Sequence, residues 1–491
     1  MTSLAIITDV SAFQLTIWSG RLLGVLFVPL VLLQRSTRPV TTLVWILVLL
    51  FLPFLGVILW WILGRDHMAR RRRSRSRARR EMADRFEELI LGDKPHGELR
   101  APDLTFSFGT TETILRDHHE IFPPTSGNRV AHYPDAAQAF DAFEEAIEAA
   151  RHHVHFQFYI WKPDETGTRF RDLLARKAAE GVEVRALYDA LGGISLNREF
   201  LQPIVDASGQ VAAFLPLYIW ERRLHVNFRN HRKLLVIDGR IGFTGGINIA
   251  DEYLEWFDTA TGFSGPVVLQ MQEVFAEDWY FTTGENLADV YHFPAALEEP
   301  LRLPTNCGEG AGASVVASGP DERLDILHKT FFMALNNARD RIHLITPYFV
   351  PDGATLTALQ TAALRGVDVK LLLPGTSDIP LTLHAGRTFW ESLMEAGVEI
   401  FEYQDAILHA KILLVDDTHV FVGSGNIDVR SFRLNFEANV LVECPSLNAI
   451  VEETFQEALQ KSHQVDLDSF RARPRSARLL EGAARLLSPL L

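Results

Sequence analysis

The residues of this chain best suited to chemistry form a motif, His-x-Lys-x-x-x-x-Asp, that occurs twice. The two copies comprise His231, Lys233 and Asp238, and then His409, Lys411 and Asp416, each 178 positions later. Imidazole and ammonium groups at a fixed spacing can attack, protonate and stabilise a charged reacting centre. Two copies in the same register indicate a duplicated unit in which each half contributes part of one site.

A glycine-rich segment that ends in asparagine follows each copy. The segments comprise Gly245, Gly246 and Asn248 in the first half and Gly423, Ser424 and Asn426 in the second. Glycine permits close approach of a ligand to the backbone, and asparagine supplies an amide donor at the same place. We therefore expect both segments to contact substrate.

The two motifs together favour a phosphodiester substrate. On a strand, alternate residues share a face, so the histidine and lysine of each copy are expected to project to one side. One neutral imidazole can attack phosphorus to form a phosphohistidine, while the other, protonated, gives its proton to the leaving alkoxide. The lysines and asparagines can stabilise the charge that builds on the phosphoryl oxygens. This chemistry needs no metal or cofactor, and no His, Asp and Glu cluster has metal-ligand spacing.

Four carboxylates are expected to support these groups. Asp238 directly precedes Gly239 and a second apolar run, which predicts a hairpin turn. We expect Asp238 and Asp416 to brace their turns rather than touch substrate. The two histidines must differ in protonation near neutrality. We predict that Asp258 and Glu437 each orient the imidazole of their own half, and the alternative for each is a solvated surface carboxylate.

The elements that must position these residues alternate between strands and helices, which predicts an α/β fold. In the first half we expect helices over 136–150 and 169–180 and strands over 154–159 and 182–188. In the second half we expect helices over 324–337 and 355–364 and strands over 341–346 and 367–373. Residues 126–305 and 306–491 thus form two repeats in a pseudo-twofold arrangement, with the site on the axis. The tail, 475–491, is expected to pack on the body, and the alternative is that it lies on a membrane.

Residues 1–65 are expected to form a transmembrane helical hairpin. The run 40–63 carries no charge, and about 20 apolar residues suffice to span a bilayer. The earlier run, 15–33, contains Arg21, so an interfacial or re-entrant segment is its alternative. Residues 66–125 form a basic juxtamembrane segment and linker.

Charge is distributed unevenly along the chain. Residues 1–80 carry a net charge of +10, with arginines concentrated in 70–80, and the remainder carries −24. Arginines beside a membrane helix mark the cytoplasmic side, so we expect a multi-pass plasma-membrane protein with a cytoplasmic body. The run also suits anionic lipid, whereas the acidic body disfavours nucleic acid. Cys307 and Cys444 are far apart, which favours two buried thiols over a disulfide or metal site.

Several segments resemble the phospholipase D superfamily, and within it the bacterial membrane cardiolipin synthases. The strongest are QFYIW at Gln157–Trp161, TPYFVPD at Thr346–Asp352, the two motif segments at Phe228–Tyr253 and Leu408–Asp417, and Gly423–Glu437. The resemblance implies two phospholipase D-like repeats that transfer a phosphatidyl group from one phosphatidylglycerol of the membrane to a second, releasing glycerol without a cofactor. It leaves homo-oligomerisation open.

The resemblance also implies roles for individual residues. His231, Lys233, Asp238, His409, Lys411 and Asp416 would be the catalytic set. His231 would attack, and His409 would act as acid and then as base. Tyr159 and Tyr348, in two of the resembling segments, would bind or orient substrate. Gly246 departs from the family pattern, where serine is common, so the first half lacks a hydroxyl donor.

Three other functions remain as alternatives. A phospholipase D would pass the same phosphohistidine to water or another alcohol. A nuclease can carry the same motif, but the acidic body and the membrane segment disfavour it. A non-catalytic lipid-binding scaffold would not need both motifs intact.

Overall fold

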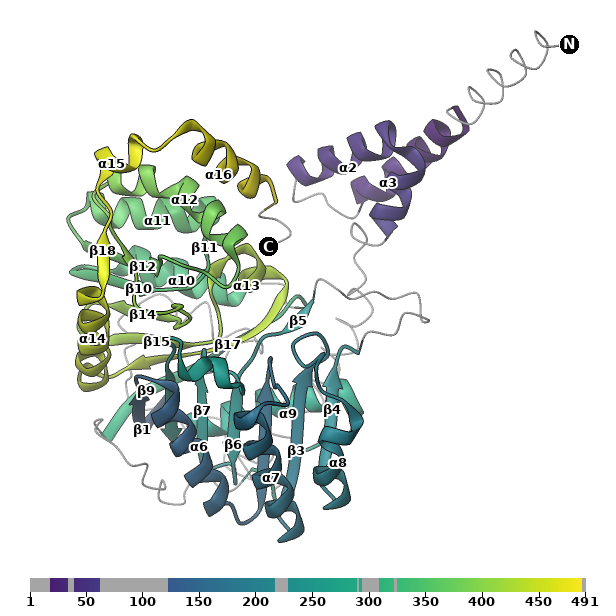
Figure 1. Cartoon of the computed structure of the whole chain (residues 1–491), viewed down its shortest axis with the longest axis vertical. Coiled ribbons are helices and arrows are strands. Elements are labelled where there is room, and N and C mark those ends of the chain that lie inside the picture. Colours follow the sequence, from purple (N-terminus) through teal and green to yellow (C-terminus); the bar gives the residue numbers. More distant parts are fainter. Residues whose placement is uncertain are drawn as a thin grey trace, which may run out of the picture. The chain divides into compact units, whose positions relative to one another are not determined.

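The body of the protein is built on one 16-stranded mixed sheet (Figure 1). The structure is a computed structural model, which describes residues 18–33, 39–61, 122–216, 228–288, 291–293, 309–321 and 325–487. The arginine run, most of the linker and Cys307 lie outside these residues, and the described Cys444 is a buried free thiol. The N-terminal helices and the body are separate compact units, and each is described by itself.

The elements of the two halves follow one another in the same order. The first half comprises β1 (Thr125–Tyr133), α6 (Ala136–Ala149), β2 (His153–Phe158), α7 (Glu165–Ala179), β3 (Glu183–Asp189), α8 (Arg198–Asp206), β4 (Gln210–Phe214), β5 (Arg229–Asn230), β6 (Leu234–Ile237), β7 (Ile241–Gly245), a 3-10 turn (Asp251–Leu254), β8 (Ala260–Ser264) and α9 (Val267–Thr283). The second half comprises β9 (Glu309–Ser318), α10 (Ile326–Asn337), β10 (Arg341–Ile345), β11 (Phe349–Val350), α11 (Gly353–Leu364), β12 (Asp368–Pro374), α12 (Pro380–Glu395), β13 (Glu399–Tyr403), β14 (Ile412–Val415), β15 (His419–Gly423), β16 (Ile427–Asp428), α13 (Val429–Arg433), β17 (Asn435–Glu443), α14 (Pro445–Gln460), β18 (Ser462–Gln464), α15 (Leu467–Arg471) and α16 (Arg475–Leu487).

Strand order reveals the duplication directly. From the antiparallel β1–β9 pair the first half runs β1-β8-β7-β6-β2-β3-β4, and the second runs β9-β17-β15-β14-β10-β12-β13-β18. Directions also correspond, because β2 is parallel to β3 and antiparallel to β6, as β10 is to β12 and β14. The expected α/β fold with two repeats is confirmed.

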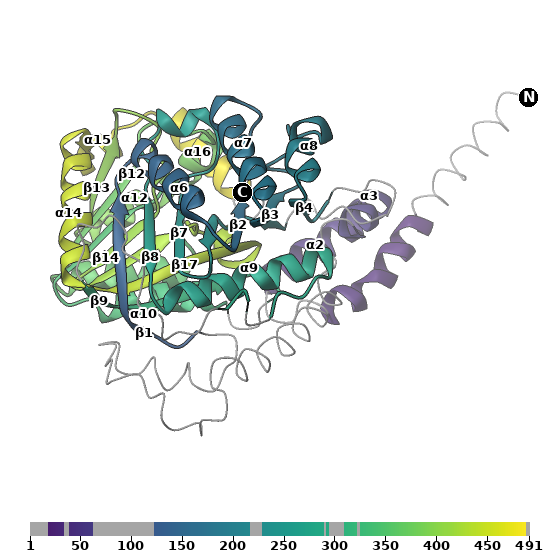
Figure 2. The same cartoon turned by 90° about the horizontal axis from the view of Figure 1, so that it is seen from below.

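Helices cover both faces of the strands. Helices α6, α7 and α8 pack on one face in the first half (Figure 2), and α10, α11 and α12 contribute to one core in the second. Successive residues of each motif strand point into different hydrophobic cores. Leu235 and Leu413 belong to the core of their own half. Leu234 and Ile412 belong to a third core, which both halves share and which includes residues of α9 and α14. The strands of the motifs are therefore buried on both faces.

The expected helices and strands are present, and two helices begin earlier than expected. Helix α7 begins at Glu165 and α11 at Gly353, because Asp164 and Asp352 accept hydrogen bonds from backbone N–H groups of the first turn. Such caps satisfy donors that the helix leaves free. The tail forms α16, which packs on α12 with Ala484 buried while its Leu486 stays exposed.

The motif aspartates occupy matching turns. Asp238 lies between β6 and β7 with φ 55°, and Asp416 lies between β14 and β15 with φ 52°. The Asp238 carboxylate accepts hydrogen bonds from the backbone N–H groups of residues 151–153 at 2.8–2.9 Å. Asp416 does the same for residues 339–341 at 2.8–3.2 Å. Each carboxylate therefore ties its turn to the loop that enters β2 or β10.

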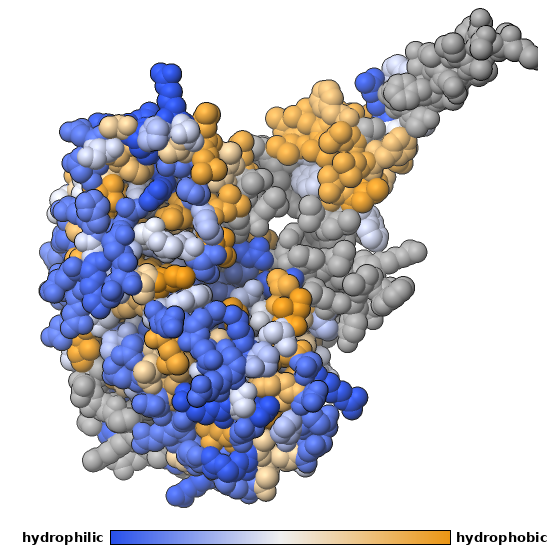
Figure 3. All heavy atoms as spheres, in the orientation of Figure 1, coloured by the Kyte–Doolittle hydropathy of each residue, from blue (hydrophilic) through white to orange (hydrophobic). Residues whose placement is uncertain are grey.

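The N-terminal unit consists of apolar helices, shown in orange in Figure 3. Residues 18–33 are helical, and the second apolar run forms α2 (Pro39–Phe51) and α3 (Pro53–Leu59). The break falls before Pro53, whose missing N–H and ring disfavour an unbroken helix. Within the described residues, no single helix combines the length and apolarity needed to cross a membrane.

Candidate active site

Each histidine–lysine pair is held in place by a strand or loop of the opposite half. His231 lies between β5 and β6, and its backbone N–H donates to the carbonyl of Phe436 in β17 at 2.9 Å. His409 directly precedes β14, and its N–H donates to the carbonyl of Phe257 at 2.8 Å. Neither half therefore forms its part of the site alone.

The carboxylates that orient the imidazoles are crossed between the halves. Glu437 follows Phe436, and its Oε2 lies 3.0 Å from Nδ1 of His231. Asp258 follows Phe257, and its Oδ2 lies 2.6 Å from Nδ1 of His409. The prediction that each carboxylate serves its own half is wrong. The reason is that the strand pairing across the halves brings the next residue of the opposite chain segment beside each imidazole.

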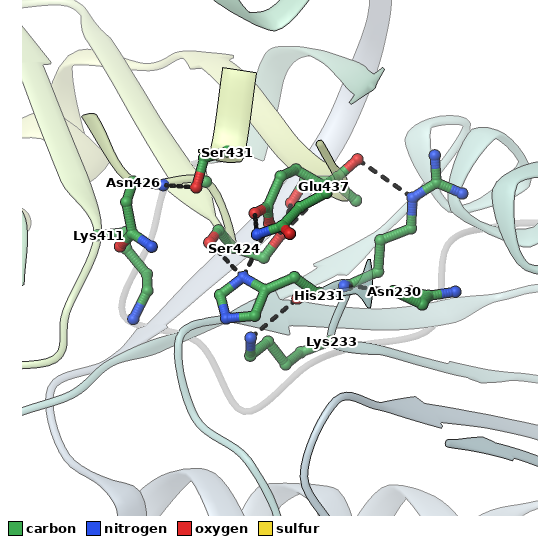
Figure 4. Close-up of polar contacts among 12 residues, drawn as sticks. Asn230, His231, Lys233, Lys411, Ser424, Asn426, Ser431 and Glu437 are labelled. Carbon is green, nitrogen blue, oxygen red and sulfur yellow. Dashed lines mark hydrogen bonds and ion pairs between the residues drawn. The ribbon is translucent and has the colours of Figure 1, made fainter. Parts of the chain in front are cut away.

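His231 has a defined tautomer because two acceptors face the same ring nitrogen. Its Nδ1 contacts the Glu437 carboxylate and, at 3.2 Å, the carbonyl oxygen of Ser424 (Figure 4). Neither acceptor can donate a proton while Glu437 is ionised, so Nδ1 carries the hydrogen and Nε2 keeps its lone pair. Burial lowers the pKa of His231 to about 4. The ring is therefore neutral and nucleophilic at Nε2.

Glu437 is held ionised by the groups around it. Burial alone would raise its pKa, but the hydrogen bond from His231, the charge of Lys233 and the hydroxyl of Ser424 keep that pKa below its ordinary value. Ser424 Oγ donates to Oε2 at 2.6 Å, and Asn435 Nδ2 donates to Oε1 at 3.0 Å. Both carboxylate oxygens are thus engaged.

His409 has the opposite arrangement. Its Nδ1 lies 2.9 Å from Nζ of Lys411, which is a donor, and beside Asp258, whose pKa burial raises to about 7. A protonated Asp258 is a donor as well, so Nδ1 accepts and Nε2 carries the hydrogen. Burial and the positive charge of Lys411 lower the pKa of the His409 ring. The pair formed by Asp258 and His409 can therefore hold one proton near neutrality.

The difference between the carboxylates arises at one pair of equivalent positions. Ser424 donates its hydroxyl hydrogen to Glu437, whereas the first half has Gly246 at the same place. A Cβ at Gly246 would lie 2.1 Å from Oδ1 of Asp258. Asp258 therefore has no hydroxyl donor there and accepts mainly from the backbone N–H of Thr259 at 2.8 Å. This serine-for-glycine difference favours an ionised Glu437 and a protonated Asp258.

The glycines of the two segments that follow the motifs are required by close packing against neighbouring strands. A Cβ at Gly245 would lie 2.3 Å from the carbonyl oxygen of Thr259, and one at Gly423 would lie 2.4 Å from that of Ala438. The space is therefore occupied by the neighbouring strand, and at Gly246 by Asp258. The prediction that Gly245 and Gly246 leave room for a ligand is wrong.

The two lysines lie close enough to affect each other. Lys233 Nζ donates to the carbonyl of His231 at 2.8 Å, and Lys411 Nζ donates to that of His409. Burial lowers the pKa of Lys411 to about 8, and burial with the charge of Lys411 lowers the pKa of Lys233 well below its ordinary value. Two buried ammonium groups of like charge suit an anionic ligand, which would restore both pKa values.

A cavity of about 420 Å³ joins the two histidines, and the two lysines are not among the residues that line it. Both histidines line it, with Asn248 and Tyr159 from the first half and Asn426, Tyr348 and other residues from the second. The Asn248 amide bonds the Ile160 N–H and the Tyr253 hydroxyl. The Tyr348 hydroxyl donates to Asp378 at 2.7 Å. The volume is within the range of small-molecule sites, so a lipid headgroup, but not its acyl chains, fits inside.

The sequence analysis missed several residues that line the cavity: Arg229, Glu252, Tyr253, Trp256, Asp378, Asp428, Arg430 and Asn435. Arg229 lies two residues before His231, so strand alternation could have identified it. Asp428, Arg430 and Asn435 lie within Gly423–Glu437, a segment in which only Gly423, Ser424, Asn426 and Glu437 were assigned roles. Asp378 carries no local signal, since only the tertiary fold brings it to the cavity.

Comparison with known proteins identifies similar chains. Residues 143–279 and 331–459 match the family model described as "Cardiolipin synthase, PLD-like domain", and residues 22–65 match "Phospholipase D-nuclease N-terminal". "Cardiolipin synthase 1" of Bacillus cereus is 38% identical over 97% of this chain and 93% of the relative. "Cardiolipin synthase" of Halalkalibacterium halodurans is 34% identical over 96% and 95%.

A solved structure shares the fold. Phosphatidylserine synthase of Haemophilus influenzae superposes with a TM-score of 0.58 at 17% identity, covering 78% of this chain and 100% of that chain. The similarity supports the two-repeat architecture.

The Ser424 hydroxyl should set the acid limb of the pH profile. In Ser424→Ala, Glu437 loses a charge-assisted hydrogen bond, so the pKa of Glu437 rises. Activity requires ionised Glu437. As the pH is lowered, the variant should therefore lose activity at a higher pH than the wild type. One such bond corresponds to about 1–2 pH units. The alkaline limb, which follows Asp258 and Lys411 as pH rises through about 7 to 8, should not move. The measurement is kcat/KM against pH, which reports the free enzyme.

The matched control is Ser392→Ala, since that hydroxyl donates to a carbonyl inside α12. An acid limb that stays in place in Ser424→Ala, or an alkaline limb that moves instead, would contradict the assigned role of Ser424.

Proposed function

The chain belongs to the cardiolipin synthase family of phospholipase D-like proteins, and we propose how its residues carry out the transfer. It is a phosphatidyltransferase that makes cardiolipin. We infer that the donor and the acceptor are both phosphatidylglycerol and that glycerol is released. The observation that carries the mechanism is the difference between the groups that face the two Nδ1 atoms: acceptors face His231, whereas the Lys411 ammonium faces His409. This difference favours a lone pair at Nε2 of His231 and a hydrogen at Nε2 of His409.

In the first half-reaction His231 Nε2 attacks the phosphorus of the donor lipid. A P–N bond forms and the P–O bond to the glycerol headgroup breaks, while His409 passes its Nε2 hydrogen to the departing oxygen. Asp258 replaces that proton at Nδ1. Lys233, Lys411 and the two asparagines hold the non-bridging oxygens as charge builds on them.

The second half-reaction reverses these roles. The hydroxyl oxygen of a second phosphatidylglycerol attacks the phosphohistidine, the P–N electron pair returns to His231, and His409 takes the hydroxyl proton at Nε2. The new P–O bond completes cardiolipin. Because water or another alcohol could attack in the same way, the identity of the acceptor decides between a synthase and a phospholipase D.

We propose that the N-terminal unit anchors the enzyme in the plasma membrane as a helical hairpin, with the body on the cytoplasmic side. Support comes from the apolar surface of these helices, where Leu33 and Phe51 are 81% and 76% exposed. A helix interrupted at a proline is tolerated in membranes, since neighbouring groups satisfy the freed backbone. The arginines at 70–80 favour the cytoplasmic orientation.

The proposed reaction predicts two products from one lipid. Purified full-length protein with phosphatidylglycerol in mixed micelles and chelator should yield cardiolipin and glycerol in equal amounts, without a cytidine nucleotide. Lipids are measured by mass spectrometry and glycerol enzymatically. His231→Gln should lose both products while retaining its fold by circular dichroism.

Three outcomes would contradict this proposal. Phosphatidic acid and glycerol without cardiolipin would indicate a phospholipase D. Nicking of plasmid DNA by the wild type but not by His231→Gln would indicate a nuclease. Neither activity, with lipid binding unchanged in the variant, would indicate a scaffold.

The proposed anchor predicts that residues 1–62 hold the protein in the membrane. Wild-type protein should remain in the membrane fraction after alkaline carbonate extraction, because the hairpin is embedded in lipid. A variant without residues 1–62 should be released from it. Release of the wild type by carbonate would contradict a hairpin and favour attachment at the membrane surface.

A further inference from the structure

Arg229 is a buried cation two residues before His231, and among the described residues its guanidinium has no hydrogen-bond acceptor. It is 1% exposed and lines the same cavity as His231. Among the described residues, no group accepts a hydrogen bond from its Nε or from either terminal nitrogen. A buried guanidinium without hydrogen-bond acceptors is costly, so its position favours an anionic ligand.

The groups around Arg229 leave its guanidinium without a hydrogen-bond acceptor. The negative charge of Asp189 acts on Arg229, but the Asp189 carboxylate accepts hydrogen bonds from the backbone N–H groups of Asn230 and Leu191 at 2.9 and 2.8 Å and none from Arg229. Arg430 lines the same cavity, and its positive charge acts on Arg229. Two arginines of like charge at one cavity wall favour an anion between or beside them.

Arg229 also breaks the symmetry of the duplication. The first half presents Arg229, His231 and Lys233 at alternate positions, which share a face in an extended chain. The equivalent of Arg229 in the second half, 178 positions later, is Ile407. The extra cation therefore lies only on the side of His231, the proposed nucleophile. We infer that it binds a group other than the donor phosphate, which the two lysines already stabilise.

We propose that Arg229, with Arg430 beside it, binds a second phosphate, which is the phosphodiester of the acceptor lipid. The proposal rests on the proposed function and deepens it, because it explains what selects phosphatidylglycerol over water as the acceptor. The donor phosphate is held between the lysines, and the acceptor brings its own phosphate to the arginine.

The geometry of the acceptor fits this assignment. In phosphatidylglycerol three carbons separate the attacking hydroxyl from the phosphate, so the phosphate remains several ångströms from the reacting phosphorus. Residues two apart on an extended chain are separated by roughly 7 Å, which is comparable to the extended chain from that oxygen to its phosphorus. Arg229 forms no bond in the reaction, and the proton of the attacking hydroxyl still goes to His409.

The test compares two acceptors that differ only in a phosphate. Full-length protein receives phosphatidylglycerol as donor with equal concentrations of isotope-labelled glycerol and glycerol 3-phosphate. Their products are labelled phosphatidylglycerol and phosphatidylglycerophosphate. The wild type should favour the phosphate-bearing acceptor. In Arg229→Gln the KM for glycerol 3-phosphate should rise about 10- to 100-fold, the effect of one charge-assisted hydrogen bond. Transfer to glycerol, which has no phosphate, should fall much less, so the ratio of the two products should shift about 10- to 100-fold toward labelled phosphatidylglycerol.

Two further variants make the result specific. Arg229→Lys should restore part of the preference because it keeps the charge but not the guanidinium fork. Arg176→Gln removes an exposed arginine that pairs with Glu148 on the surface, and it should leave both acceptors unchanged. Both variants use the same assay.

The outcomes separate this inference from the proposed function. Equal loss of both products in Arg229→Gln would overturn the acceptor site and assign Arg229 to the donor phosphate or to folding. An unchanged ratio would overturn any phosphate site there. A wild type that makes no cardiolipin yet prefers glycerol 3-phosphate, with that preference lost in Arg229→Gln, would overturn the proposed function and support the Arg229 site.

Discussion

The site depends on the hydrogen bonds that join each histidine segment to the opposite half. The N–H of His231 is bonded to the carbonyl of Phe436, and the N–H of His409 to that of Phe257. The next residue in each case is the carboxylate that orients the imidazole. A shift of either half would therefore misplace a histidine and its orienting carboxylate together. The shared core beneath both halves, with α9 and α14, opposes such a shift.

The duplication supplies symmetry, and the chemistry needs that symmetry broken. Two identical histidine sites would compete for the same role, since a nucleophile must be deprotonated at Nε2 and an acid must be protonated there. The break occurs beside the motifs rather than within them. Ser424 in place of Gly246 supports an ionised Glu437, and Arg229 in place of Ile407 adds a cation on the side of His231. In the proposed mechanism, these differences let the same fold provide one nucleophile and one acid.

Much of this arrangement could be predicted from the sequence, because the signals are local. The repeated motif identified both histidines and lysines, and hydrophobic alternation placed the strands that carry them. The position of Asp258 and Glu437 near the histidines was predicted, but their exchange between halves was not, since spacing within one half contains no information about pairing across two. The role of the glycines was also misjudged, because only the folded strands show that Thr259, Ala438 and Asp258 occupy the space. Arg229 was visible by alternation but became notable only when its lack of partners was seen.

The most direct measurement locates the phosphatidyl group on the enzyme. A donor with a p-nitrophenol leaving group needs no general acid, so His409→Asn should react with it and then stall without a base for the acceptor. After quenching in alkali, which preserves phosphohistidine, peptide mass spectrometry should find the phosphatidyl adduct on His231. His231→Asn should form none. An adduct on His409 in the His231→Asn variant, with none on His231 in the His409→Asn variant, would contradict the assignment of nucleophile and acid drawn from the crossed carboxylates.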